Sequence, residues 1–337
     1  MKRLRIFTWH IHGSYLYYLS QIPHDIYIPK KNVSEDGYAG ITPSYPWPSN
    51  LKEIPVEDLR NWKFDCILYQ SHRNYLVDQN EILTSEQREL PKVYLEHDPP
   101  RESPTDTVHP VNDPNILVVH VTDFNRLMWD CRRSPTTVID HGVMIPDGIQ
   151  YQGNFTKGLV VVNNIHKRGR RLGLDIFTAA RKELELDLVG MGWDKVDGYG
   201  EVPHAQLPLF SSQYRYFFNP IRYTSMGLAI CEAMMVGLPI IGLATTELST
   251  VIENEVSGFI STRPNELIEA SKELIADKRL ALKWGEGAKR IALERFSMGR
   301  FIDDWNRTLG QVVGTNSYRK SHRDFDKLEE KTWTLQS

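Results

Sequence analysis

Cysteine is scarce in this sequence. Cys66, Cys131 and Cys231 stand far apart in a chain of 337 residues. An odd and widely spaced set gives neither a disulfide framework nor the paired spacing of a zinc site. We therefore expect free thiols, a reducing compartment and, by default, a cytoplasmic location.

Long hydrophobic runs are also missing, since no stretch approaches the roughly 18 apolar residues that a membrane-spanning helix needs. The opening segment MKRLRIFTWHIHG begins with basic residues, but His10, His12 and Gly13 interrupt it before it reaches signal-peptide length. We interpret it as a first strand. Any membrane contact is expected to be peripheral, at the inner face of the membrane.

An excess of charge of one sign is absent as well, because 40 Lys and Arg oppose 43 Asp and Glu, for a net charge of -3. Overall attraction to nucleic acid is therefore not expected. A hydrophobic content of 41% and a charged content of 25% exclude a disordered chain and a membrane bundle. The length predicts two domains that share a cleft.

Short apolar runs alternate with longer amphipathic stretches, which is the pattern of βα units around a parallel sheet. The predicted class is α/β, with two doubly wound halves. Strands are predicted at residues 3–8, 25–28, 66–70, 92–95, 116–121, 159–162, 187–189, 214–218 and 239–243. Helices of the second half are predicted at residues 174–184, 204–211, 228–236 and 246–253.

Two proline-rich segments, 36–50 and 98–114, are predicted to be irregular loops. The polar stretch 146–157 predicts the boundary between domains at 1–150 and 151–312. A last helix is predicted at about 299–312, before a polar tail at 313–337. We expect the final helices to pack on the first domain.

The segment 217–239, FFNPIRYTSMGLAICEAMMVGLP, is the most informative. Gly227 opens a predicted helix, and the amides at a helix N-terminus attract anions such as a diphosphate. Glu232, one turn further, is placed to accept hydrogen bonds from two ribose hydroxyls. An amphipathic helix with an incidental glutamate fits the spacing equally well.

This segment resembles the signature of glycosyltransferase family 4, which comprises retaining enzymes of GT-B fold. Gly227-Leu228, Glu232-Ala233-Met234 and Gly237-Leu238-Pro239 match in order and spacing, whereas Thr224 replaces the first Glu of the Glu-x7-Glu pattern. The resemblance implies that Glu232 holds the ribose, and it puts sugar contact by Thr224 in doubt. It further assigns donor contacts to Val202, Asn219, Ser225, Met226, Gly227 and Leu228.

Residues 163–171, NNIHKRGRR, form a cationic run directly after an apolar strand. By composition it is a solvated face, a nucleic-acid patch or a phosphate clamp. Its place at the carboxyl end of a strand favours ligand binding. The resemblance implies that Arg168 and Arg171 act on the diphosphate as catalytic residues, with Asn164 and Lys167 among the donor contacts.

The first strand leads into Trp9-His10-Ile11-His12-Gly13-Ser14. The resemblance assigns the backbone of Gly13 and Ser14 to the donor phosphates or the acceptor. A His-x-His at this place is also typical of metal-dependent amidohydrolases, which need further ligands such as His97, His120 or His141 at later strand ends.

His97 follows another predicted strand and is either a satisfied loop histidine or, as the resemblance implies, a catalytic residue at the donor sugar. His141, before the interdomain linker, is expected to be structural. The tail contains Asp324-Phe325-Asp326, an Asp-x-Asp that follows no predicted strand and is attributed to chance.

The combined interpretation is a GT-B hexosyltransferase, similar to bacterial exopolysaccharide or envelope polysaccharide glucosyltransferases. It is expected to use UDP-glucose and a saccharide or lipid-linked acceptor, to work without a metal or other cofactor, and to bind no nucleic acid. A non-catalytic nucleotide-sugar-binding protein and, third, a metal-dependent hydrolase using His10 and His12 remain as alternatives.

Overall fold

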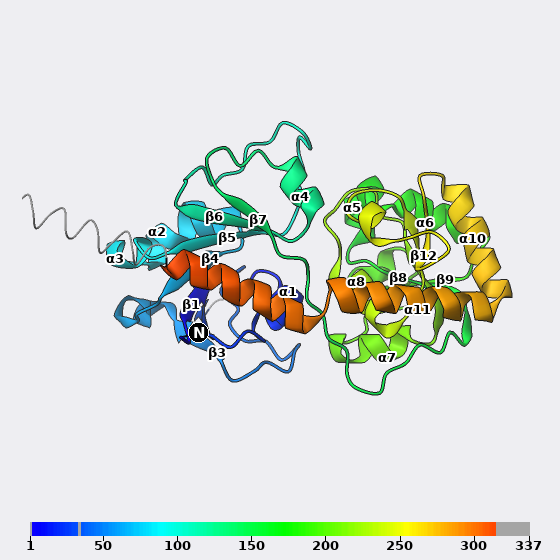
Figure 1. Ribbon diagram of the computed structural model, residues 1–337, viewed down its shortest axis with the longest axis horizontal. Coiled ribbons are helices and arrows are strands. Elements are labelled where there is room, and N and C mark those ends of the chain that lie inside the picture. Colours follow the sequence, from blue (N-terminus) through cyan, green and yellow to red (C-terminus); the bar gives the residue numbers. More distant parts are fainter. Residues whose placement is uncertain (1, 33–34, 315–337) are drawn as a thin grey trace, which may run out of the picture.

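The computed structural model describes residues 2–32 and 35–314, which form two α/β domains. Each domain is built on an open sheet of parallel strands, 7 in the first domain and 5 in the second. Figure 1 shows the two domains side by side, with helices packed around each sheet. The predicted α/β class and its two halves are confirmed.

The first sheet has the order β3-β2-β1-β4-β5-β6-β7 and the second the order β12-β11-β10-β8-β9. In each sheet the order reverses once, between β1 and β4 and between β8 and β10, and open α/β sheets bind ligands at the carboxyl ends of strands beside such a reversal. The strands are β1 (Arg5–Thr8), β2 (Asp25–Lys30), β3 (Leu51–Pro55), β4 (Cys66–Tyr69), β5 (Lys92–Glu96), β6 (Ile116–His120), β7 (Thr136–Val138), β8 (Phe155–Val161), β9 (Leu186–Val189), β10 (Tyr214–Asn219), β11 (Ile240–Leu243) and β12 (Gly258–Ser261).

The connections carry short helices in the first domain and longer ones at the end of the second. In the first domain these are α1 (Gly13–Leu19), η1 (Val56–Asn61), η2 (Asn74–Asp78), α2 (Gln79–Ile82), α3 (Ser85–Arg88) and α4 (Asp123–Met128). In the second they are α5 (Ile165–Arg168), η3 (Gly169–Leu172), α6 (Leu174–Ala180), η4 (Trp193–Lys195), η5 (His204–Gln206), α7 (Leu207–Ser211), α8 (Leu228–Val236), α9 (Leu248–Val251), α10 (Pro264–Ala276) and α11 (Lys278–Arg295).

The strands predicted from apolar runs all exist, because central parallel strands are buried on both faces and therefore read as continuous hydrophobic segments. Every residue of β4 and of β10 is buried. Three strands were missed, namely β3, β7 and β12. All three lie at sheet edges and are partly exposed, so their sequences carry more polar residues.

Some predicted bounds were wrong. The helices predicted at 174–184 and 246–253 are shorter, since α6 ends at Ala180 and α9 covers only Leu248–Val251. Strand β8 begins at Phe155, inside the stretch predicted as a polar boundary. Its first residues are exposed, and they are held in the sheet by the backbone pairing of Phe155 with Tyr214, by the edge-on contact of these two rings at 5.4 Å, and by the ion pair of Lys157 with Asp187.

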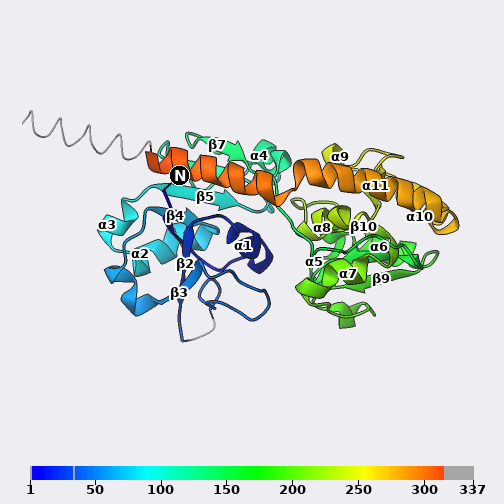
Figure 2. The same ribbon diagram turned by 60° about the horizontal axis from the view of Figure 1, so that its bottom comes forward.

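The chain returns to the first domain after α11. Figures 1 and 2 show α11 on the second domain and the following helix, residues 298–314, running on over the first. In that helix Phe301 and Trp305 are buried, and the Phe301 ring lies 5.9 Å from that of Tyr15 in α1. The predicted last helix therefore packs on the first domain. The tail from residue 315 on, with Asp324 and Asp326, lies outside the described residues.

One buried apolar cluster is shared by both domains and runs from Tyr15 in α1 through Phe301 to Met234 in α8. The burial of this cluster holds the two domains in one arrangement. Within the described residues, no helix is both long and apolar enough to cross a membrane.

Candidate active site

Hydrogen bonds join the two domains around the carboxyl ends of the strands, and three of them lie at α8 and the turn before it. The Tyr18 hydroxyl donates to Glu232 Oε1 at 2.6 Å, and the Tyr223 hydroxyl donates to the Pro100 carbonyl at 2.8 Å. His141 Nε2 lies 2.8 Å from the carbonyl oxygen of Met226, so it donates to that oxygen. These contacts bring α1 and the loops after β5 and β7 against α8 and the turn that opens it.

Glu232 is buried at the middle of α8 and is the single charged residue of that helix. Its Oε1 accepts from Tyr18 and lies 3.0 Å from His204 Nε2. No described residue donates to its Oε2. The carboxylate is thus held in one orientation by its first oxygen and keeps acceptor capacity on the second.

The N-terminus of α8 begins at Gly227, whose backbone is extended and whose position is open on the Cβ side. Ser225, in the turn before it, is buried, and its hydroxyl has no hydrogen-bond partner among the described residues. A helix start with free amides and an unpartnered buried hydroxyl is suited to an anionic group with oxygen atoms.

The cationic run after β8 divides into paired and unpaired groups. Arg170 forms an ion pair with Asp175, which also binds Arg222. Within the described part of the chain, the side chains of Lys167, Arg168 and Arg171 make no ion pair or hydrogen bond. These three cations are therefore available to a ligand.

Arg171 also faces the first domain. Partial burial, together with the nearby charges of Arg101 and Arg168, lowers the pKa of Arg171, while Asp98 has the opposite effect. Cations from both domains are thus close enough to repel one another. A dianionic group between them would relieve this repulsion.

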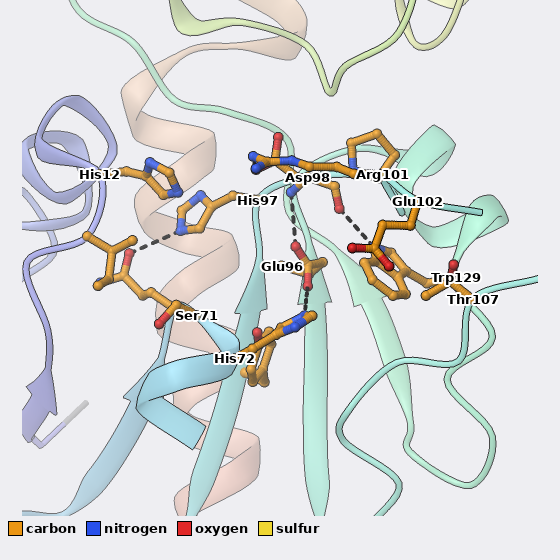
Figure 3. Close-up of a pocket in the computed structure, with 14 residues that line it drawn as sticks. His12, Ser71, His72, Glu96, His97, Asp98, Arg101, Glu102, Thr107 and Trp129 are labelled. Carbon is orange, nitrogen blue, oxygen red and sulfur yellow. Dashed lines mark hydrogen bonds and ion pairs between the residues drawn. The ribbon is translucent and has the colours of Figure 1, made fainter. Parts of the chain in front are cut away.

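A cavity of about 490 Å³ opens in the first domain, and Asp98 and Arg101 are part of its lining. Figure 3 shows this lining. His12 and His97 lie on one side, Glu96 is at the centre, and Arg101 with Asp98 lies at the edge nearest the second domain. The volume falls within the range of small-molecule sites.

The tautomer of His97 is set by Gln70. The Gln70 amide nitrogen donates to Thr8 Oγ1 and to the Trp9 carbonyl, both at 2.8 Å, so its Oε1 accepts from His97 Nε2 at 3.1 Å. Burial, with smaller effects of His12 and His141, holds the pKa of His97 well below its ordinary value of 6.5. His97 is therefore neutral and has a proton acceptor at Nδ1.

The other residues that were predicted to contact the sugar donor lie on several elements around the cleft. They do not all line one cavity. Asn164 precedes α5 in a left-handed conformation (φ 52°), and Asn219 is the buried last residue of β10. Val202 and Leu228 are half-buried against the apolar core. Thr224 is half-buried in the turn before α8.

Gly13 and Ser14 begin α1, but Gly13 lines a separate hollow of about 400 Å³ with Tyr45 rather than the cavity of Figure 3. His10, which also lines that hollow, bonds through Nδ1 to the Gly40 carbonyl at 2.6 Å. The alternative of a closed-barrel amidohydrolase is wrong in architecture, because both sheets are open. In the described residues, no group of three or more His, Cys, Asp or Glu side chains is arranged to hold a metal.

Several site residues were not predicted from the sequence. Tyr18 and His204 bind Glu232, Gln70 orients His97, and Arg101 faces Arg171. The proline-rich stretch 98–114, which holds Arg101, gave a signal, since a long loop beside a strand end often has a function. Tyr18 and Glu232 are 214 positions apart, so no local pattern connects them.

Residues 183–291 match the family described as "Glycosyl transferases group 1". This segment holds Glu232 and the turn at Gly227, so the coarser part of the family resemblance is confirmed. The assignment to family 4 and the retaining mechanism stay predictions. No curated protein sequence matches the chain significantly.

Solved structures match over most of the chain. Sucrose-phosphate synthase from Thermosynechococcus elongatus is similar with a TM-score of 0.67 and 15% identity, over 93% of this chain and 100% of that one. HepE of Anabaena, in complex with UDP and glucose, gives a TM-score of 0.65 and 14% identity over 92% and 100%. TarM of S. aureus, bound to UDP, gives 0.58 and 15% over 75% and 58%. The matched structures confirm the predicted GT-B fold.

Proposed function

We propose that this chain is a retaining glycosyltransferase that moves a hexose, glucose before others, from a UDP-sugar to a saccharide or lipid-linked acceptor. The proposal places the reaction in polysaccharide biosynthesis in the cytoplasm, with peripheral contact at the inner membrane face and without a metal. The observation that carries it is the position of the cationic run beside the turn before α8. The Arg171 carbonyl accepts from the amides of Arg222 and Tyr223 at 3.0 and 3.2 Å, and the same turn leads into the helix that holds Glu232.

Different residues of the site are proposed to contact different parts of the donor. Glu232 Oε2 is free to accept from the ribose hydroxyls, while the open helix start at Gly227 faces the diphosphate. The unpaired guanidinium groups of Arg168 and Arg171 match phosphate oxygens in a bidentate manner. UDP in the titles of the HepE and TarM structures supports UDP as the nucleotide.

In the proposed reaction, the bond between the sugar and the β-phosphate breaks as the acceptor hydroxyl attacks from the same face. The departing phosphate oxygen takes the proton of that hydroxyl, so no protein nucleophile is required. Arg168, Arg171 and the α8 amides stabilise the negative charge that develops on the diphosphate. His97 Nδ1 accepts a hydrogen bond from a sugar hydroxyl, since its other nitrogen is engaged by Gln70.

The experiment that tests the proposal measures UDP binding by calorimetry and transfer from UDP-glucose in the presence of EDTA. Glu232→Gln keeps the shape of the side chain but removes its charge, so UDP binding should weaken by about 1.5–3 kcal/mol, the value of a hydrogen bond to a charged group. Unchanged UDP affinity in the folded variant would contradict the role of Glu232. Loss of turnover with EDTA, restored by magnesium, would contradict the metal-free mechanism.

A non-catalytic nucleotide-sugar-binding protein is the second candidate, and Thr224 is the observation in its favour. The family resemblance places a carboxylate there that contacts the sugar, whereas threonine has a neutral hydroxyl. A protein that binds UDP-glucose but neither transfers the sugar nor slowly hydrolyses the donor would support this second candidate over the first.

A further inference from the structure

The cavity of Figure 3 differs in charge from the donor side of the cleft. The donor side presents unpaired Lys167, Arg168 and Arg171, whereas the cavity lining contains three carboxylates and one guanidinium. If the donor diphosphate lies on the cationic side and its hexose reaches His97 at one side of the cavity, as proposed above, the rest of the cavity, around Glu96 and Ser71, is left for the acceptor. Its charges then determine which acceptors enter.

Glu96 forms the centre of the cavity wall and is 7% exposed. Its Oε1 accepts from the Asp98 amide at 3.0 Å, and its Oε2 lies 3.2 Å from His109 Nε2. His109 Nδ1 accepts from the amide of Val111, so Nε2 carries the proton that is donated to Glu96. The carboxylate is thus held by neutral donors and lacks an arginine or lysine partner in the described chain.

The other charges do not compensate for Glu96. Arg101 is paired with Asp98, so these two largely cancel. Glu102 is exposed and has no ion-pair partner among the described residues. His72 Nε2 lies 3.9 Å from Glu96 Oε2, but burial lowers the pKa of His72 and leaves it mainly neutral at pH 7.

The lining also offers groups that bind hydroxyls. Ser71 Oγ accepts from the amide of Asn74 and keeps its own proton for a ligand, and His72 Nε2 reaches the same part of the cavity. The ring of Trp129 forms an apolar wall on the far side. Polar groups around an apolar surface, with a net negative charge, suit an uncharged polyol better than an anion.

We infer that the acceptor unit entering this cavity is an uncharged sugar, and that sugars with a phosphate or carboxylate group are excluded. The inference rests on the proposed function and names the acceptor class for that site. An anionic group placed here would lie near Glu96 and Glu102 and would lose its water shell without gaining a free cation. A neutral hydroxymethyl group at the same place has no such cost.

The test compares methyl glucoside with methyl glucuronide, which differ only in a hydroxymethyl group and a carboxylate. Transfer from UDP-glucose is followed as UDP release above donor hydrolysis, at pH 7 and low salt. We expect at least a tenfold preference for the glucoside. Glu102→Lys should reduce that preference below threefold, while the UDP dissociation constant stays within twofold.

Glu89→Lys is the matched control, because Glu89 is exposed on the same domain but does not line the cavity. It should leave the tenfold preference unchanged. Equal transfer to both glycosides, an unaltered preference in Glu102→Lys, or transfer to neither glycoside while UDP still binds would each overturn the inference. Failure of the wild type to bind UDP would instead contradict the proposed function.

Discussion

Of two adjacent arginines in the cationic run, one forms an ion pair and the other does not. Arg170 is bound to Asp175, whereas Arg171 is unpaired and faces Arg101 across the cleft. The sequence NNIHKRGRR predicted a cationic cluster at a strand end, but it could not show which guanidinium groups are free. That difference depends on Asp175 and Arg222, which lie on other elements.

This contrast gives a matched pair of variants. Arg171→Ala should lower kcat by about 100-fold or more, the effect of removing one donor that stabilises developing negative charge. Arg170→Ala removes an equal charge one position away and should change kcat less than threefold. Initial rates at saturating UDP-glucose decide the matter, and similar losses in both variants would show a general electrostatic effect instead.

Thr224 limits how much the sugar of the donor contributes to binding affinity. Because a neutral hydroxyl forms hydrogen bonds about half as strong as those of a carboxylate, UDP-glucose and free UDP should bind within about tenfold of each other. Thr224→Glu should widen that gap in favour of UDP-glucose, and Thr224→Ala should leave it small. Calorimetry on the three proteins measures the gap; a narrower gap in Thr224→Glu would refute this role.

At the scale of elements, α8 was predicted with its observed bounds. Gly227 and Gly237 flank its apolar run, and Gly237 has a φ of 104°, which ends the helix in the left-handed region. The edge strands β3, β7 and β12 lacked such signals, because their stability comes from backbone pairing with a neighbour. Local sequence therefore predicted the central strands and the largely buried edge strand β9, and it missed the three edge strands that are more exposed.

The last helix packs closely on the first domain at Gly142, which has no side chain. A Cβ atom at Gly142 would overlap the side chain of Phe301. Gly142→Ala should therefore destabilise the protein by about 1–3 kcal/mol, the usual cost of overpacking. Gly299→Ala, in the same helix, has open space around its Cβ and should be neutral or slightly stabilising.

Urea unfolding followed by tryptophan fluorescence compares these two variants with the wild type. Equal stability of Gly142→Ala and the wild type would mean that residues 298–314 do not pack closely on the first domain in solution.

At the scale of the whole molecule, buried histidines make the fold sensitive to acid. Burial lowers the pKa of His120 to about 3 and also lowers the pKa values of His97 and His141. Because these groups bind protons more readily when unfolded, stability is present above pH 6.5 and is lost as the pH falls below it.

The free energy of unfolding should therefore decrease steadily from pH 7 to pH 5. His120 alone accounts for about 2 kcal/mol of this decrease, at 1.36 kcal/mol per pH unit. His120→Gln should reduce the slope by that amount, while the curves of variant and wild type should run parallel from pH 7 to pH 8.5. Unchanged slopes below pH 6.5 would contradict a neutral buried His120.

The two domains were predictable from the sequence because alternating strands and helices reveal a parallel sheet locally. The cleft between them was not, since it is assembled from pairs such as Tyr18 with Glu232 and Tyr223 with Pro100. A family motif located Glu232 and Gly227. The acceptor side, with Glu96 and Arg101, follows no such motif and became visible only in three dimensions.

The return of residues 298–314 to the first domain affects how the protein is made. Tyr15 and Gly142 emerge early from the ribosome, but Phe301, which packs on both, emerges near the end. At about 5–20 residues per second, the interval between residues 142 and 301 is roughly 8–30 s. During synthesis the first domain therefore has an uncovered apolar face, and it completes its core only after the second domain has been translated.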